Sequence, residues 1–356
     1  MIKEYGYEYN AVVNNELLSQ CEWKGTDKKF WGAYSLRSGR DALKVIAREH
    51  PNSTVYLPSL CCDSMITPFE LYDCKIVFYP LTDELCVDYI KLSKILENSA
   101  ACSILLFYDY FGIKMFETTQ LIEIKKKYCD LILVRDITHN LLCFNELDID
   151  VDYTIASLRK WTNITDGGLL WTNHKLQNTH FFENSAFAKQ RLKAQCLRTE
   201  FFETGSEVTK EKYRKIFSEV SALLDEDKDP IKMSEYSYEI SANTDWEDIK
   251  KIRRDNAEIL YEIFSGCEGI RLINSITDES NLYVPIMLKN RDEVQSRLSK
   301  QGIFNTIIWP LREMQISSCE NTACVGEHML AVPCDQRYTK EDMSYIGTEI
   351  VRAINE

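Results

Sequence analysis

The feature that most constrains the fold is an alternation of short apolar runs with amphipathic segments in the first half of the chain. The apolar runs are TVYLPSL (54–60), CKIVFYPL (74–81), ACSILLFYDYFG (101–112), DLILVRD (130–136), DYTIASL (152–158) and GGLLWTN (167–173). Apolar residues recur every three or four positions in SGRDALKVIAREH (38–50), DYIKLSKILENS (88–99) and TQLIEIKKKYC (119–129). Strands that alternate with helices predict an α/β fold with a mostly parallel sheet.

The remainder of the chain predicts a second, smaller unit. Because 356 residues exceed the usual size of one core, we expect a large α/β domain over 1–243 and a smaller C-terminal α+β domain over 244–356. A charged helical connection is expected between residues 180 and 232. A helix is predicted over 244–266, with Thr244 or Asp245 as N-cap and Gly266 at its end. The pattern then predicts a strand over 280–288, a helix over 291–302, a strand over 304–310 and a helix over 339–355.

Composition excludes several classes of function. A formal net charge of −13 would repel a phosphate backbone, so no nucleic-acid partner is expected. The N-terminus lacks a basic and then apolar signal, and no apolar run approaches the roughly eighteen residues of a membrane span, so we expect a cytoplasmic protein. The 13 cysteines are odd in number and often lie in apolar runs, which favours reduced thiols. The five histidines show no ligand spacing with cysteines, and no metal site is expected.

Polar residues that follow the apolar runs are the candidates for function. In open α/β sheets, ligands bind outside the carboxyl ends of the strands. The residues at those positions are Ser59, Tyr110, Asp136, His139, Ser157 and Lys160.

The segment SGRDAL (38–43) is a candidate phosphate site. A Ser-Gly pair that opens a helix exposes backbone N–H groups and the positive end of the helix dipole, and both favour a phosphate. Ser38 and Gly39 would form this cup, with Arg40 beside it. The same pair also begins many helices simply as a cap, and this reading stays open.

Asp136 and His139 follow the run LILV. A carboxylate at the end of a buried strand stays ionised only if a cation or a strong donor meets it. A protonated pyridine nitrogen is one such partner, and Arg135 is another. Adjacent residues of a strand point to opposite faces, so Arg135 is poorly placed to pair with Asp136. His139 can be either a functional residue or a hydrogen-bonded core histidine.

Lys160 follows the next strand and is followed in turn by Gly167 and Gly168. Desolvation at a strand end lowers the pKa of an amine and makes it a nucleophile toward an aldehyde. Pyridoxal phosphate requires a helix N-terminus for its phosphate, a carboxylate for its ring nitrogen, a hydrogen-bond partner for its ring hydroxyl and a lysine for its aldehyde. Ser38 with Gly39, Asp136, His139 and Lys160 supply these groups in chain order.

With these motifs the sequence resembles the DegT/DnrJ/StrS family of pyridoxal-phosphate-dependent aminotransferases, which aminate nucleotide-linked keto sugars. SGRDAL is similar to the family's Ser-Gly-Thr-x-Ala-Leu cup, VYLPSLCCDS to its Pro-Ser turn and RDITHN to its Glu-Asp-x-x-Gln motif. DYFG, SLRKWTNITDGGLLWTN and LAVPCDQRYTKEDMSYI resemble the segment that ends in Tyr-Gly, the Schiff-base lysine segment and the closing loop with the final helix. The resemblance implies a fold-type I transferase with a seven-stranded, mostly parallel sheet between helices.

The resemblance also implies a role for each site residue. Lys160 would form the internal aldimine and shuttle a proton, Asp136 would keep the pyridine nitrogen protonated, and His139 would contact the ring hydroxyl or the ring face. The phosphate would be held by Ser38, Gly39, Arg40 and Ser157. Cys62 stands where the family has an aromatic residue that stacks on the cofactor, and Ser157 precedes the lysine by three residues instead of five. A homodimer with shared active sites is implied as well.

The function expected from this site is transfer of an amino group from an amino-acid donor, glutamate, to a keto acceptor, a nucleotide-linked keto sugar. Arg40, Arg159 and Arg312 are candidates for the donor carboxylate or a diphosphate. Two alternatives stay open, an elimination on a sugar with the same cofactor and a relative that binds a ligand without catalysis. Trp23, Trp31 and Trp161 are candidates for interface or substrate-stacking aromatics, or are core residues.

Overall fold

A seven-stranded sheet forms the centre of the computed structural model, which describes residues 3–11, 30, 32–99, 102–112, 117–142, 151–273 and 281–356. Its strand order is β2-β8-β7-β6-β5-β3-β4, and β8 alone runs antiparallel to both of its neighbours. The strands are β2 (Tyr34–Leu36), β3 (Thr54–Pro58), β4 (Lys75–Tyr79), β5 (Ser103–Tyr108), β6 (Ile132–Asp136), β7 (Tyr153–Ser157) and β8 (Gly168–Thr172). Each predicted apolar run contains one strand, and the predicted mostly parallel α/β fold is confirmed. The three-residue strand β2 was not predicted.

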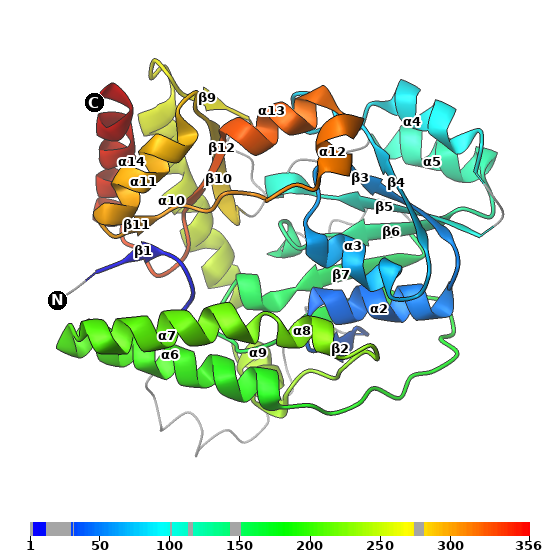
Figure 1. The fold of residues 1–356 in the computed structure, drawn as a ribbon, viewed down its shortest axis with the longest axis horizontal. Coiled ribbons are helices and arrows are strands. Elements are labelled where there is room, and N and C mark those ends of the chain that lie inside the picture. Colours follow the sequence, from blue (N-terminus) through cyan, green and yellow to red (C-terminus); the bar gives the residue numbers. More distant parts are fainter. Residues whose placement is uncertain are drawn as a thin grey trace.

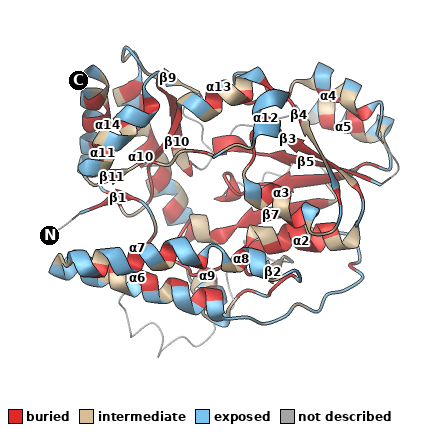
Figure 2. Ribbon diagram, viewed as in Figure 1, coloured by how far each residue is buried: buried red, intermediate tan, exposed pale blue. Residues whose placement is uncertain are grey.

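Helices cover this sheet, and their apolar faces explain why the strands read as continuous apolar runs. The covering helices include α2 (Gly39–Glu49), α3 (Asp63–Glu70), α4 (Tyr89–Leu96) and α5 (Thr118–Lys127). Every residue of β5 is buried, as expected for a parallel strand that is covered on both faces. Figures 1 and 2 show the buried strands lying among these helices; α4 and α5 carry exposed residues, whereas the residues of α2 are buried or partly buried. The three predicted helices of this region are confirmed.

A second hydrophobic core lies in the C-terminal part of the chain. It is built from the antiparallel strands β9 (Arg271–Leu272), β10 (Tyr283–Met287) and β12 (Met329–Pro333) and from the helices α10 (Trp246–Phe264), α11 (Arg291–Lys300) and α14 (Lys340–Asn355). Asp245 caps α10 by accepting a hydrogen bond from the backbone of Asp248, and Gly266 follows with φ +76°. Both predicted ends of this helix are therefore confirmed. The predicted boundary between residues 243 and 244 stays a prediction.

One predicted strand is wrong. The segment 304–310 was expected to be a strand, but β11 comprises only Ile303–Phe304, and the helices α12 (Glu313–Ser318) and α13 (Glu320–His328) follow the segment. Ile307 packs against the C-terminal core, whereas Ile308 and Trp309 pack against the core of the large sheet. The segment is apolar because it crosses between two cores, and its apolar residues therefore give the pattern of a buried strand.

The N-terminus joins the C-terminal part of the molecule. Strand β1 (Tyr5–Gly6) pairs in parallel with β11, about three hundred residues later in the chain, and Figure 1 shows the two side by side near the N label. Tyr5 belongs to the C-terminal hydrophobic core. This pairing brings residues 6–9 toward the carboxyl ends of the large sheet.

The predicted helical connection is a hairpin of two long helices. These are α6 (Ala186–Thr204) and α7 (Glu207–Val220), followed by the short helices α8 (Leu223–Glu226) and α9 (Glu235–Ala242). Ala194, Phe201, Tyr213 and Phe217 form a small core between α6 and α7. The hairpin runs along the lower edge of the molecule in Figure 1.

Three further findings concern the described residues alone. No helix among them is both long and apolar enough to cross a membrane. No group of three or more His, Cys, Asp or Glu side chains in these ranges could hold a metal ion. The cysteines that the structure describes form no disulfide.

Candidate active site

Two adjoining cavities lie at the carboxyl ends of the parallel strands, and together they contain all eight residues predicted to hold the cofactor or act on it. We call them the inner cradle and the outer chamber. Seven predicted residues line the inner cradle, namely Ser38, Gly39, Arg40, Cys62, Asp136, Ser157 and Lys160. His139 lines the outer chamber, and Lys160 and Arg159 line both cavities. The structure therefore brings together residues that are separated by more than 120 positions in the sequence.

The ends of two neighbouring strands place Asp136 and Lys160 at the same edge of the sheet. Strand β6 ends at Asp136, and the parallel strand β7 ends at Ser157, with Asp136 in register with Ile155. A single 3-10 turn, Leu158–Lys160, then carries the lysine over the end of β7. This is the geometry that the spacing of the two motifs predicts.

Gly168 explains why glycines follow the lysine. A Cβ at this position would lie 2.1 Å from the carbonyl carbon of Ser38 and 2.7 Å from the backbone nitrogen of Gly39. Strand β8 can therefore pass directly against the start of helix α2 only if residue 168 has no side chain. The glycine brings the lysine segment and the candidate phosphate cup together.

The cup is held in shape by a buried ion pair. Ser38 is the N-cap of α2, and its hydroxyl accepts a hydrogen bond from the backbone N–H of Asp41 and donates one of 2.5 Å to the carboxylate of Asp41. Arg37 donates two hydrogen bonds to the same carboxylate, at 3.0 and 3.1 Å. Arg40 donates to Asp225 at 2.7 Å and to Ser64 at 3.1 Å. Ser38 is thus also an ordinary helix cap, which is the alternative role that the sequence left open.

Asp136 is a buried carboxyl group. It is 5% exposed and accepts a hydrogen bond of 2.8 Å from the backbone N–H of Thr138. Burial raises its pKa to about 6, although the Thr138 hydrogen bonds and the charge of Lys160 act in the opposite direction. Arg135 pairs instead with Asp109 at 2.7 Å, so the inference that it is poorly placed to pair with Asp136 is confirmed.

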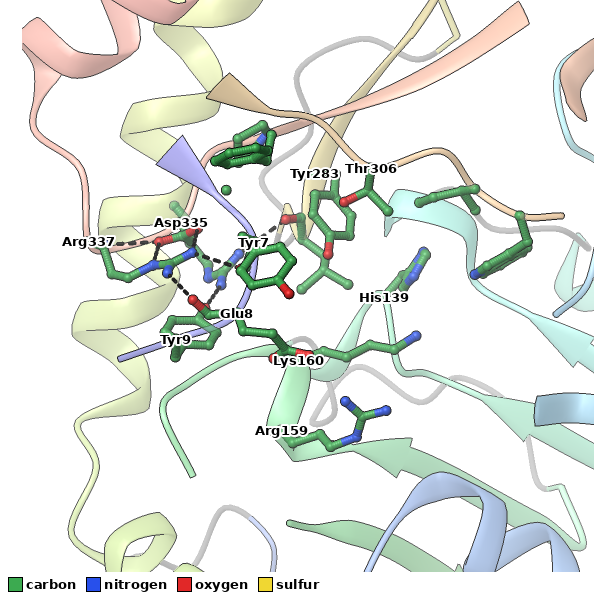
Figure 3. A pocket seen from close by; sticks show the side chains of 17 residues that line it. Tyr7, Glu8, Tyr9, His139, Arg159, Lys160, Tyr283, Thr306, Asp335 and Arg337 are labelled. Atoms are coloured by element: carbon green, nitrogen blue, oxygen red, sulfur yellow. Dashed lines mark hydrogen bonds and ion pairs between the residues drawn. The ribbon is translucent and has the colours of Figure 1, made fainter. Parts of the chain in front are cut away.

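Lys160 has the environment of a nucleophilic amine. Burial lowers its pKa, and the charges of Arg159 and Arg40 add to this effect, while Cys62 and Asp136 oppose it. Figure 3 shows the side chains of Lys160 and Arg159 extending in the same direction, with His139 across the cavity from them. A larger fraction of the amine is therefore neutral at neutral pH than for a solvated lysine.

His139 lies in an aromatic cluster. Its ring centroid is 4.8 Å from that of Tyr108, 5.0 Å from that of Phe111 and 5.9 Å from that of Trp309. Burial lowers its pKa well below the usual value, so the imidazole is neutral. Its Nδ1 atom is buried and has no hydrogen-bond partner among the residues that the structure describes. A neutral ring with an unpartnered nitrogen can still bond to a ligand in the chamber.

The walls of the outer chamber include groups that the sequence did not reveal. The chamber has a volume of about 310 Å³. Its walls include the N-terminal segment Gly6–Tyr9, Tyr283, Thr306, Trp309, Asp335 and Arg337. Glu8 pairs with Arg191 at 2.6 Å, and Arg337 pairs with Asp335 at 2.7 Å and donates to the carbonyl of Glu8. No motif marks these residues, because contacts across most of the chain bring them to the site.

Several other candidates lie elsewhere. Ser59 is hydrogen-bonded to Thr322, Tyr110 donates to the carbonyl of Leu60, and neither lines the two cavities. Arg312 pairs with Asp63 and Glu70 at 2.7 Å each and also lies outside them. Trp161 is fully buried, as expected for a core residue. Trp23 and Trp31 fall outside the described residues.

The fold is shared with solved aminotransferase structures at low sequence identity. A DegT/DnrJ/EryC1/StrS aminotransferase from Brucella abortus is 14% identical, with a TM-score of 0.62 over 97% of this chain and 92% of that chain. NtdA from Bacillus subtilis, solved with its cofactor PMP bound, is 14% identical, with a TM-score of 0.62 over 91% and 73% of the two chains. DesI, solved in the presence of its TDP-sugar product, is 14% identical, with a TM-score of 0.67 over 96% and 86%.

These comparisons confirm the fold that the resemblance implied. The sequence matches no family model, and it matches no curated protein. The likeness is therefore one of structure, and it covers nearly the whole chain.

Proposed function

We propose that this chain is a pyridoxal-phosphate-dependent aminotransferase. The observation that carries the proposal is that the carboxyl of Asp136 and the amine of Lys160 line one cradle together with the start of helix α2. The fold shared with a protein named as an aminotransferase, and with NtdA solved with its cofactor PMP bound, adds support. Perturbed titratable groups that converge in one cavity are typical of active sites.

The inner cradle fits this cofactor in charge and in hydrogen bonding. Its ionisable lining comprises the cations Arg40, Arg159 and Lys160 and the carboxyl of Asp136, with Cys62 and Tyr108 beside them. An anionic phosphate would balance the cations, and a protonated pyridine nitrogen would give Asp136 the cationic donor that it lacks. Ser38, Gly39, Arg40 and Ser157 would hold the phosphate, Cys62 would flank the ring, and His139 would meet the ring hydroxyl or the ring face.

The bound cofactor would supply the aldehyde and the electron sink of transamination. Lys160 would attack that aldehyde through its neutral Nζ and would later carry a proton on the same atom between two carbon positions. Asp136 would remain ionised beside the ring N–H, because this cation offsets the cost of burying the carboxylate. The aromatic rings around His139 would exclude water from the reacting groups.

We further propose glutamate as the amino donor and a nucleotide-linked keto sugar as the acceptor. The structure of DesI with a TDP-sugar product supports this class of acceptor for the shared fold. A chamber of about 310 Å³ falls at the lower end of the range for small-molecule sites and can enclose a sugar ring. The homodimer with shared active sites is part of this proposal.

The acceptor can be found with the protein loaded in its amine form. The purified chain would be incubated with pyridoxamine 5′-phosphate, freed of excess, and mixed with single keto compounds, nucleotide-linked keto sugars first. An acceptor restores the aldehyde absorbance in one turnover. If keto sugars and keto acids all leave the amine form unchanged while the cofactor binds, amino transfer is excluded. Elimination or binding without catalysis would then be favoured.

A further inference from the structure

Arg159 is a charged side chain at the candidate site for which the structure provides no partner. Its Nε atom is buried without a hydrogen-bond partner among the described residues. The carboxylate of Glu8, whose charge acts on Arg159, accepts two hydrogen bonds from Arg191, at 2.6 and 3.2 Å. Arg253 and Arg337, the other guanidinium groups of the outer chamber, are both hydrogen-bonded within the protein. A partly buried guanidinium without a partner among the described residues, at the wall of a cavity, points to an anionic ligand.

Two other side chains at the phosphate end of the cradle, Ser38 and Arg40, are already engaged. The hydroxyl of Ser38 donates to Asp41, and Arg40 divides its hydrogen bonds between Asp225 and Ser64. Arg159 lies two residues after Ser157, whose Cβ would be 3.6 Å from a Cβ placed on Gly39 at the start of α2. Arg159 lines the cradle together with the cup residues Ser38, Gly39 and Arg40, and its Nε remains available to a ligand there.

The charge balance of the cradle leads to the same conclusion. Three cations line it, Arg40, Arg159 and Lys160, against the single carboxyl of Asp136. The Asp225 that pairs with Arg40 lies outside the cradle and is half exposed. A phosphate monoester dianion carries two negative charges, which would pair with the guanidinium groups of Arg40 and Arg159.

We propose that Arg159 is a main binding residue for the phosphate of the cofactor, where it forms a charge-assisted pair that Ser38 and Arg40 cannot supply alone. This inference rests on the proposed function and assigns to the phosphate a residue that was until now a candidate for the donor carboxylate. Arg159 reaches the phosphate from the turn that carries Lys160, so that one turn fixes both ends of the ligand.

In the cofactor-free protein, the Nε of Arg159 is buried without a partner among the described residues. Burial lowers the pKa of Arg159 to about 10, and the charges of Arg191 and Arg40 contribute to that shift. The charged guanidinium is therefore less favourable in the folded chain than in the unfolded one at neutral pH.

The test compares pyridoxal 5′-phosphate with pyridoxal, which has the same aldehyde and ring but no phosphate. Affinity is measured from the visible band of the adduct with Lys160 in wild type, Arg159→Gln, Arg159→Lys and the control Arg254→Gln, which lines neither cavity and whose carboxylate partners are partly exposed and 3.6 to 3.9 Å away. We expect Arg159→Gln to weaken the binding of pyridoxal 5′-phosphate on the order of ten- to a hundredfold, while the affinity for pyridoxal stays unchanged. The affinity of Arg159→Lys for pyridoxal 5′-phosphate should lie between those of wild type and Arg159→Gln. The affinity of Arg254→Gln should equal that of wild type.

Each other outcome overturns the assignment. An equal loss for both ligands would place Arg159 at the ring or in the fold. Unchanged binding of both ligands, with a raised KM for glutamate, would assign it to the donor carboxylate. A wild-type protein that forms no adduct with either aldehyde would refute the proposed function itself, and the role of Arg159 with it.

Discussion

The indole Nε1 of Trp161 donates a hydrogen bond of 2.7 Å to the backbone carbonyl of Thr138. Trp161 follows Lys160, and Thr138 lies between Asp136 and His139, so this bond ties the two loops that carry the candidate catalytic groups. The carbonyl of Trp161 in turn accepts hydrogen bonds from Tyr9 and Gln336, at 3.1 and 2.8 Å. The N-terminal segment and the C-terminal part of the chain thus meet at the residue after the lysine.

Replacing Trp161 with phenylalanine should weaken the connection between the two loops. The substitution removes the bond to Thr138 and leaves a buried carbonyl without its donor, which costs about 1–3 kcal/mol. Trp246→Phe is a matched control, because Trp246 is equally buried and donates at 2.9 Å to Ser241, away from both loops. Urea unfolding should show similar destabilisation in both variants. Only Trp161→Phe should weaken cofactor binding, and an equal loss of affinity in both would remove the positioning role of Trp161.

Gly168→Ala should break the contact between strand β8 and the cup. The new Cβ would lie 2.1 Å from the Ser38 backbone, which cannot move without displacing the start of α2. We expect a loss of about 1–3 kcal/mol of stability, or more, measured by thermal or urea unfolding. Gly39→Ala is the control for stability, since its Cβ would meet Ser157 at an ordinary 3.6 Å. Equal stability of the two variants would contradict the close approach described above.

Stability of the cofactor-free protein should depend on pH through Asp136. Its pKa is raised from 3.8 to about 6, so folding favours the protonated carboxyl, and the stability that the chain has at low pH is lost as pH rises from about 4 to about 6. Asp136→Asn keeps the shape without the charge. Its stability relative to wild type should be near zero below pH 4, should grow between pH 4 and pH 6, and should level off above pH 6 at on the order of 3 kcal/mol. A stability difference between Asp136→Asn and wild type that does not change with pH would show that burial does not raise the pKa of Asp136.

With cofactor bound, the same substitution should impair the reaction. A neutral amide cannot stabilise the protonated pyridine nitrogen, which makes the ring a poorer electron sink. The half-reaction of Asp136→Asn with glutamate, followed by stopped-flow absorbance, should slow by orders of magnitude. Near-normal rates in a variant that binds cofactor would remove Asp136 from the mechanism.

The sequence allowed most of the large sheet and the inner cradle to be predicted, because both depend on local patterns. Buried parallel strands read as apolar runs, and the polar residues at their ends, such as Asp136 and Ser157, follow directly. Cys62 and Gly39 were located by motif, and the structure places them in the same cradle.

The outer chamber could not be predicted, because distant parts of the chain form it. Tyr7 and Glu8 come to the site through the pairing of β1 with β11, and Arg337 holds them there. Trp309 lies in a segment that crosses between two cores and therefore carries no strand or helix period. That Arg159 lacks a partner among the described residues can be seen only in the structure, where Glu8 pairs with Arg191 and Asp225 pairs with Arg40.

The most direct test of the central claim is the absorbance of the purified chain after addition of pyridoxal 5′-phosphate. We expect a visible band that borohydride bleaches, with the reduced adduct mapped by mass spectrometry to Lys160. The band should be absent in Lys160→Ala and unchanged in Lys175→Ala, a substitution of an exposed lysine outside both cavities. A wild-type protein that stays colourless, or an adduct that forms at full yield in Lys160→Ala, would contradict the account.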